Sequence, residues 1–200
     1  MLCVFSLSAF SQDERYFRSI FSGDLFDRKD DAYYYKVKVE SPKYVIDLNR
    51  DSKDDYFQTI KMDGNDFISI HDEYGRETFR TMLETKGKNS SIFQVSFKQV
   101  DKNTDVLILH FYEGETQSAI FEGTARLYFL TIPNRDLKNI TVTKGPFFWM
   151  EKEKAAGKYY NRRYTVNTLD YNKDGSREIS VSYNHITRIY FYRNGSWQYL

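Results

Sequence analysis

The chain has 200 residues, of which 40% are hydrophobic and 18% aromatic, and its formal charge is +1. This length suits one domain or a few small stacked units, and the low counts of 10 Gly and 3 Pro exclude a low-complexity chain. The near-zero charge argues against a general nucleic-acid binder, which normally carries a strong basic excess. The 17 Tyr and 16 Phe favour strands.

The first residues resemble a targeting segment. Leu2–Phe10 is an uncharged run of apolar and small residues, and Ala9-Phe10-Ser11 resembles the small-x-small site that precedes signal cleavage. A basic n-region is missing, and the alternative is a buried N-terminal strand. We expect residues 1–11 to be a signal peptide remnant, residues 12–200 to form a single β-rich domain, and the protein to be secreted, periplasmic or on the cell surface. The run is too short to span a bilayer, so no membrane span is expected.

The single cysteine, Cys3, lies inside this segment. A mature chain would then hold no cysteine, which excludes a disulfide framework, a Cys nucleophile and a Cys-based zinc site. An exported protein without disulfides needs another source of stability. A metal ion that binds only the folded state is one such source.

The N-terminal third predicts a helix followed by strands. Tyr16, Phe17, Ile20 and Phe21 share one helical face, so a short amphipathic helix is predicted within residues 12–27. Apolar alternation bounded by turn residues then predicts strands at Tyr33–Glu40, Lys43–Leu48, Tyr56–Met62, Asp66–His71 and Thr78–Glu84.

The rest of the chain continues as strands and turns. Val106–Tyr112 is the most apolar strand, which suggests burial on both faces. Ser118–Ile132 is long enough for one bent strand or two, with Gly123 at the bend. Lys144-Gly145-Pro146 reads as a turn. The other predicted strands are Ser91–Val100, Ile140–Thr143, Tyr159–Thr168, Glu178–Tyr183, Thr187–Tyr192 and Trp197–Leu200.

The most informative stretch is Asp170–Glu178, which reads D-Y-N-K-D-G-S-R-E before an apolar run. It carries an acid at position 1, an amide at 3, an acid at 5, Gly at 6 and an acid at 9. Ca²⁺ takes roughly six to eight oxygen ligands, and oxygen-bearing side chains on alternate residues of a loop supply them. The Gly allows the tight turn. These oxygen-bearing residues, Asp170, Asn172, Asp174 and Glu178, make the stretch a candidate Ca²⁺-binding loop.

Two further stretches repeat this pattern. One has Ser52 in place of the Gly and carries Asp47, Asn49, Asp51 and Asp55 at positions 1, 3, 5 and 9. The other, Asp101–Asp105, repeats positions 1, 3 and 5 only, and whether it binds metal stays open. Recurrence of one pattern predicts a repeated unit, with units at about residues 33–90, 91–157 and 158–200.

A strand, an acidic loop of this type, an apolar strand and a hairpin are together similar to the calcium-loop repeats of the FG-GAP and VCBS type in secreted bacterial proteins. The similarity covers roughly residues 42–84 and 159–200. It implies Ca²⁺ ligation by side chains at loop positions 1, 3, 5 and 9 and by the carbonyl at position 7. That carbonyl belongs to Lys53 in the first loop and Ser176 in the third.

Two alternatives bear on these loops. An EF-hand has helices on both sides and Glu at loop position 12, which here is Val181, so that site is excluded. The other alternative is an empty polar turn, because Asp, Asn and Gly also stabilise ordinary turns.

No catalytic motif stands out. His71, His110 and His185 match no local metal pattern, and the chain has no Walker loop, dinucleotide glycine fingerprint or G-x-S-x-G elbow. Phe147, Phe148 and Trp149 are a candidate ligand surface, because three consecutive aromatic residues cannot all face one side of a regular strand.

The sequence therefore predicts a mainly β fold of antiparallel repeat units, arranged as a propeller or as an open stack or sandwich, with a short N-terminal helix. The expected function is an exported, non-catalytic binding module with structural Ca²⁺ and an unknown protein or glycan ligand. The alternative is a secreted hydrolase that acts on glycan or peptide; a glycosidase needs two carboxylates that face one cleft.

Overall fold

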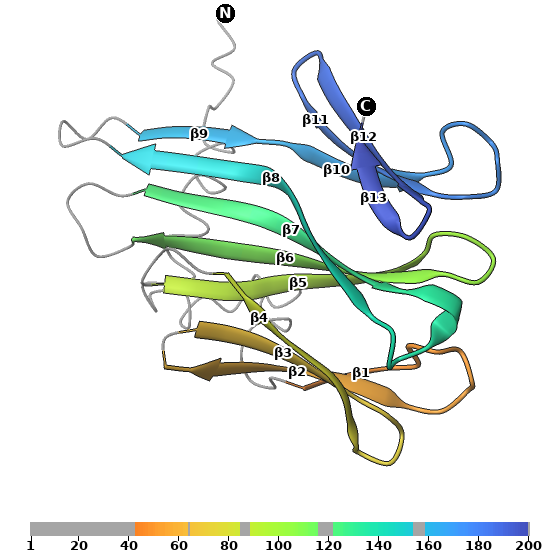
Figure 1. Cartoon of the computed structure of the whole chain (residues 1–200). Helices are drawn as coiled ribbons and strands as arrows, with labels where there is room; N and C mark the ends of the chain where they lie inside the picture. The colour runs from red at the N-terminus through yellow and green to blue at the C-terminus, as the bar shows by residue number, and fades with distance from the viewer. Residues whose placement is uncertain (1–42, 64, 85–88, 116–121, 154–158, 200) are drawn as a thin grey trace, which may run out of the picture.

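The computed structural model describes residues 43–63, 65–84, 89–115, 122–153 and 159–199, and the described chain is mainly β, as predicted (Figure 1). The helix predicted within residues 12–27 lies outside the described residues, as do the strand Tyr33–Glu40 and the signal segment 1–11. Among the described residues, no helical segment has the length and hydrophobicity of a membrane span. The described elements are β1 (Lys43–Ile46), β2 (Asp55–Met62), β3 (Asn65–His71), β4 (Glu77–Leu83), β5 (Asn89–Gln99), β6 (Asp105–Glu115), β7 (Glu122–Ile132), the 3₁₀ turn η1 (Pro133–Arg135), β8 (Thr141–Glu153), β9 (Tyr159–Arg163), β10 (Thr165–Leu169), β11 (Glu178–Tyr183), β12 (Ile186–Arg193) and β13 (Ser196–Tyr199).

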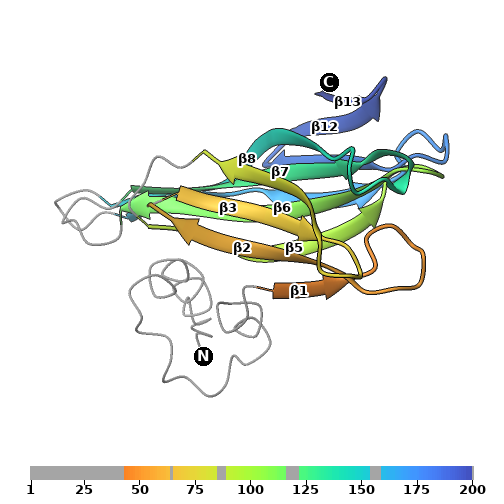
Figure 2. The ribbon, with the colours of Figure 1, turned by 60° about the horizontal axis from the view of Figure 1, so that its bottom comes forward.

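The strands form three antiparallel sheets in which sequence neighbours pair. The first sheet has the order β1-β2-β3-β4, the middle sheet β5-β6-β7-β8-β9 and the third sheet β10-β11-β12-β13. The middle sheet has the longest strands and curls across the molecule, with the first sheet on one side and the third on the other (Figures 1 and 2). Three layers packed in chain order correspond to the open stack among the predicted arrangements.

Each face of the middle sheet supplies one hydrophobic core. On β6, Leu107 and Leu109 pack with Phe57 and Ile70 of the first sheet, whereas Val106 and Ile108 belong to a second cluster with the third sheet. All four β6 residues are at most 2% exposed. Because successive side chains of a strand point to opposite faces, the expectation that Val106–Tyr112 is buried on both faces is confirmed.

Polar contacts also join the layers. The indole N–H of Trp197 donates to Thr131 Oγ1 at 2.8 Å, which ties β13 to β7. The N–H of Arg177 donates to the carbonyl of Val100 at 2.7 Å, between the loops that precede β11 and β6. The third sheet is therefore held to the middle sheet near the ends of its strands as well as through the core.

Strand β8 corrects the predicted turn at Lys144-Gly145-Pro146. The strand runs without interruption through these residues, and the predicted short strand Ile140–Thr143 is only its start. Tyr128 pairs with Lys144 and Arg126 with Phe147, so Gly145 and Pro146 together oppose one residue of β7. Such a bulge accepts proline because its extra residue makes no regular ladder hydrogen bond.

Gly123 is also placed differently from the prediction. It lies within β7 directly opposite Gly114 of β6, where the ladder continues without a register shift. A Cβ at Gly123 would lie 2.0 Å from Tyr112 Oη. The glycine is needed because the phenol ring of Tyr112 crosses over it, and not because the strand bends there.

Candidate functional site

The three acidic stretches occupy the same place in the three sheets. Each joins the first strand of its sheet to the second, and Figure 1 shows all three loops at one end of the molecule. The second strand begins with an acid that pairs with the last residue of the first strand in each case. These pairs are Asp55 with Ile46, Asp105 with Gln99 and Glu178 with Leu169.

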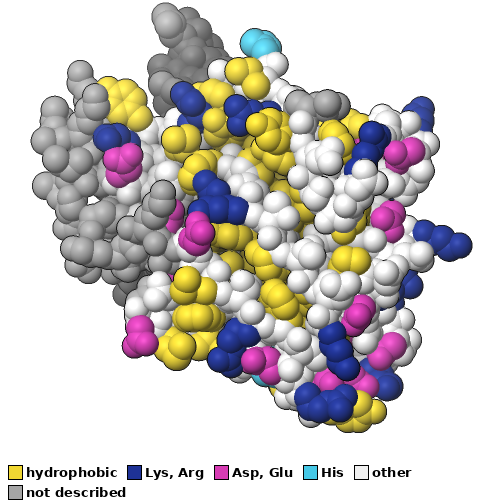
Figure 3. All heavy atoms as spheres, viewed as in Figure 1, with side chains coloured by type: hydrophobic (Ala, Val, Ile, Leu, Met, Phe, Trp, Pro, Cys, Tyr) yellow, Lys and Arg dark blue, Asp and Glu magenta, His cyan; other side chains and the backbone are white. Residues whose placement is uncertain are grey.

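The carboxylates that begin the second strands are buried, although they lie at the end of the stack. Asp55 and Asp105 are 0% exposed and Glu178 is 4% exposed. On the face shown in Figure 3, the acidic side chains visible at this end are interspersed with Lys and Arg. A buried carboxylate is costly unless it is hydrogen-bonded, paired or bound to a metal, so the partners of these three acids decide what the loops can do.

The first and third loops fold in the same way. In each, the carboxylate at position 9 accepts the N–H of position 2, the carboxylate at position 1 accepts the N–H of position 6, and the side chains at positions 3 and 5 accept the N–H groups of positions 5 and 7. The acceptors in this order are Asp55, Asp47, Asn49 and Asp51 in the first loop, at 2.9–3.0 Å, and Glu178, Asp170, Asn172 and Asp174 in the third, at 2.8–3.1 Å.

The backbone conformations of these two loops match as well. Position 4 has φ 59° in both loops, at Arg50 and at Lys173, and position 6 has φ 68° at Ser52 and 87° at Gly175. Two left-handed residues on either side of position 5 turn the chain tightly, so the side chains at positions 1, 3 and 5 face the inside of the loop.

The middle loop is shorter, and the sequence pattern placed one of its residues wrongly. Asp101 accepts the N–H of Asn103 at 2.8 Å, as an ordinary turn residue does. Asp105, counted as position 5 in the sequence, is the first residue of β6 and matches Asp55 and Glu178 at position 9. The middle loop therefore has fewer residues between Asp101 and this acid than the outer loops have between positions 1 and 9. The described 101–105 segment lacks the set of oxygen ligands that the other two loops carry.

Asp55 has an oxygen that no described group satisfies. Its Oδ2 accepts the N–H of Leu48 at 3.0 Å, but its buried Oδ1 has no hydrogen-bond partner among the described residues. Burial raises the pKa of the Asp55 carboxyl, the N–H groups of Leu48 and Asn49 oppose this, and the charges of Asp51 and Asp47 raise it further. The carboxylate therefore lies close enough to two other acids to feel their charges.

The basic residues of the first loop point away from these acids. Arg50 binds Asp105 of the middle sheet, with Nη2 2.7 Å from Oδ1, and Lys53 Nζ lies 3.0 Å from Glu73 Oε1. The ion pairs of Arg50 and Lys53 are therefore made with acids other than Asp47, Asp51 and Asp55.

The acids of the third loop are better satisfied. The N–H of Ser176 and the amide of Asn172 hold the pKa of Asp174 below its usual range, and Glu178 accepts the N–H of Tyr171. No three acidic, histidine or cysteine side chains of the described chain converge closely enough to hold a metal as they stand. The donors in both loops are nevertheless all oxygens, and a carboxylate oxygen that accepts one hydrogen bond keeps a further lone pair.

The three predicted aromatic residues divide between core and surface. Phe148 and Trp149 are 8% and 4% exposed and pack between the middle and third sheets. A second bulge explains why two consecutive residues share a face, since Trp149 pairs with Ala125 and Phe147 with Arg126, which leaves Phe148 as the extra residue. Only Phe147 is exposed, with the Arg126 guanidinium 3.9 Å from its ring centroid, so the ligand-surface prediction remains for Phe147 alone.

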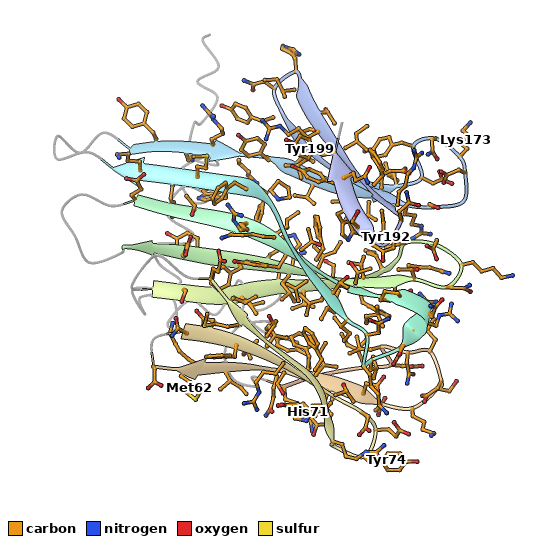
Figure 4. The ribbon with its side chains drawn as sticks, in the orientation of Figure 1. Met62, His71, Tyr74, Lys173, Tyr192 and Tyr199 are labelled. Carbon is orange, nitrogen blue, oxygen red and sulfur yellow. The ribbon has the colours of Figure 1, made fainter. Side chains whose placement is uncertain are left out.

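A cluster on the outer face of the first sheet was not predicted. Ser69 Oγ lies 2.7 Å from His71 Nε2 and donates to Glu77 Oε2 at 2.6 Å. His71 stacks on Tyr56, and Figure 4 shows it near the β3–β4 turn. Ser69, His71 and Glu77 lie at i, i+2 and i+8 across one hairpin. This spacing is the sequence signal that could have predicted the cluster. Ser69 is 0% exposed, so its hydroxyl cannot reach a substrate.

A polar groove of about 250 Å³ lies between β5, β6 and β10, and His110 forms part of its wall. Burial lowers the pKa of His110 to about 4, against a hydrogen bond to the Gln94 backbone that favours the charged form, so the imidazole is neutral at pH 7. No carboxylate lines this groove. The other lining residues are Gln94, Ser96, Lys98, Ile108, Val166, Asn167 and Thr168.

Comparisons of the chain with protein-family models, with curated proteins and with solved structures gave no match.

Proposed function

We propose that the chain is an exported, non-catalytic β-repeat module that binds a protein or glycan and holds structural Ca²⁺ in its first and third acidic loops. The observation that carries the metal is Asp55, whose buried Oδ1 has no partner among the described residues. Its carboxylate lies near Asp47 and Asp51 in a loop whose basic side chains are engaged elsewhere. A cation would give Asp55 its missing partner and reduce the repulsion among the three acids.

The donor set favours Ca²⁺ over softer metals. Carboxylate, amide and main-chain oxygens suit hard cations, whereas Zn²⁺ prefers nitrogen and sulfur. The proposed donors are Asp47, Asn49, Asp51, the Lys53 carbonyl and Asp55 in the first loop, and Asp170, Asn172, Asp174, the Ser176 carbonyl and Glu178 in the third. When bound, the ion would fix the loops that join paired strands.

The placement of the acids supports a non-catalytic role. Hydrolysis of a glycan needs two carboxylates facing one cleft, whereas the groove beside His110 is lined by no carboxylate. Glu151, two residues after Trp149, is 3% exposed and accepts a hydrogen bond from the hydroxyl of Tyr112 at 2.8 Å. No described contact favours the hydrolase, so we keep the binding module.

The test is thermal unfolding in EDTA and in millimolar Ca²⁺, with Mg²⁺ as the control ion. A hundredfold excess over Kd adds about 2.7 kcal/mol per site, which raises Tm by roughly 5–10 °C in a chain of this length. Asp174→Ala should remove only the part that comes from the third loop. A Tm that is the same in Ca²⁺, Mg²⁺ and EDTA would reduce both loops to polar turns.

A further inference from the structure

Arg50 links the first acidic loop to the middle sheet. It stands between Asn49 and Asp51, yet its guanidinium leaves the loop and binds both carboxylate oxygens of Asp105, with Nε 3.0 Å from Oδ2 and Nη2 2.7 Å from Oδ1. Asp105 is 0% exposed. A bidentate contact of this kind fixes the direction of the guanidinium as well as its distance, so the position of Arg50 depends on the conformation of its loop.

Asp105 holds the place that Asp55 and Glu178 hold in the outer sheets, but it meets guanidinium groups there. Arg135 also approaches it, with Nε 3.3 Å from Oδ2, and anchors its Nη2 on the Lys102 carbonyl at 3.0 Å. In the middle sheet the loop is too short to supply a ligand set, and two arginines pair with the buried Asp105 carboxylate instead. One of these comes from the loop proposed to bind Ca²⁺.

We propose that Arg50 is a positioning residue that couples Ca²⁺ binding in loop 47–55 to the docking of the first sheet on the middle sheet. This rests on the proposed Ca²⁺ site. Arg50 lies in the left-handed region at φ 59° between two proposed ligands, so the loop conformation that presents Asn49 and Asp51 to a cation also delivers the guanidinium to Asp105. Coupling between two binding equilibria is reciprocal. Loss of the Arg50–Asp105 contact therefore weakens Ca²⁺ binding.

The third loop supplies the matched control. Lys173 has the same loop position and the same φ of 59° as Arg50. No ion pair or hydrogen bond of its side chain is seen within the described ranges, and Figure 4 shows it at the outer end of its loop. Ca²⁺ binding in loop 170–178 should therefore not depend on this side chain.

The experiment is calorimetric titration of Ca²⁺ into proteins that keep one proposed site each. Asp174→Ala leaves the first loop and Asp51→Ala leaves the third. In the first background, Arg50→Gln should weaken Ca²⁺ binding at least about fivefold, the lower end of typical couplings, with partial rescue by Arg50→Lys. In the second background, Lys173→Gln should leave the affinity unchanged.

Asp105→Asn breaks the same contact from the other side, and it should weaken Ca²⁺ binding in the first loop as Arg50→Gln does. Circular dichroism shows whether each variant folds. If Arg50→Gln does not fold, Asp105→Asn alone supplies the test. An affinity in folded Arg50→Gln or in Asp105→Asn that stays within twofold of the parent would overturn the coupling while leaving both metal loops in place. Absence of Ca²⁺ binding in every protein, including the unsubstituted chain, would instead overturn the proposed metal sites and the coupling with them.

Discussion

Ser52 and Gly175 hold the same place in two loops on opposite sides of the middle sheet. Both residues have positive φ, 68° and 87°, and both donate their N–H to the first aspartate of their loop, at 2.9 Å to Asp47 and 3.1 Å to Asp170. One backbone design therefore serves both loops, but only the third loop has the residue type that adopts this conformation without strain.

Replacement of Ser52 by Gly should stabilise the protein. The left-handed conformation costs an L-residue about 1–2 kcal/mol, which Gly avoids. Gly also loses more conformational entropy on folding, which cancels part of this benefit. We therefore expect a net gain in stability of about 0.5–1 kcal/mol. The reciprocal change, Gly175→Ala, should cost about 1 kcal/mol from backbone strain alone, because a Cβ there meets no atom within 4 Å. Urea unfolding in EDTA measures both, and a loss of stability in Ser52→Gly would contradict the prediction.

Asp55→Asn should separate the stability of the bare loop from its metal binding. The amide oxygen can still accept the N–H of Leu48, while the buried charge next to Asp47 and Asp51 disappears. We therefore expect Tm in EDTA to be no lower than that of the unsubstituted protein, and the rise in Ca²⁺ to shrink to the contribution of the third loop. The measurement is thermal unfolding with and without Ca²⁺. A large drop of Tm in EDTA with an unchanged Ca²⁺ increment would show that Asp55 is only a structural acceptor.

The loops themselves could be anticipated from the sequence because their contacts are local. In both outer loops the side chains at positions 1, 3, 5 and 9 bind N–H groups no more than seven residues away. Their pattern and the alternation of the flanking strands were therefore visible in a single stretch of chain. The burial of Val106–Tyr112 on both faces could be predicted in the same way, from the continuous apolar run of a single stretch.

Features that depend on stacking of the sheets could not be anticipated in this way. The partner of Arg50 is Asp105, 55 residues away, and it is reached only because the first sheet packs on the middle one. The same holds for the place of Asp105 at loop position 9, which follows from strand pairing and not from spacing. Gly145-Pro146 misled the prediction because turn-forming residues also fit a bulge inside a long strand.

The stability of the protein should depend on pH through His110. Burial lowers its pKa to about 4, below the ordinary value of 6.5, so between these values the unfolded chain binds a proton that the folded chain does not. The free energy of unfolding therefore falls as pH decreases through this window, by about 3 kcal/mol in total. The stability of His110→Gln should lack this part of the pH dependence, because glutamine does not titrate.

The check is denaturant unfolding of the unsubstituted protein and of His110→Gln at pH 7 and pH 4.5. Carboxylates titrate in both proteins, so the difference between the two isolates His110. From pH 7 to pH 4.5, the free energy of unfolding should fall more in the unsubstituted protein than in His110→Gln. A gap that stays constant between the two pH values would mean that His110 keeps a normal pKa in the folded protein.

The contact between Tyr112 and Gly123 should make this glycine one of the least replaceable residues. The Tyr112 side chain is 0% exposed, and its hydroxyl donates to the buried Glu151 at 2.8 Å. A Cβ at Gly123 would lie 2.0 Å from that hydroxyl oxygen and 2.7 Å from Cζ, and the ring has no solvent to move into. We expect Gly123→Ala to cost about 3 kcal/mol.

A double-mutant cycle tests the cause of this loss. Tyr112→Phe alone should cost about 1–3 kcal/mol, because it takes the hydroxyl donor from buried Glu151. It also removes the closest atom that the new methyl group meets, so the double variant Tyr112→Phe with Gly123→Ala should be more stable than the sum of the single losses implies. Urea unfolding of the four proteins supplies the cycle. Strictly additive losses would show that the glycine is required for a reason other than the ring above it.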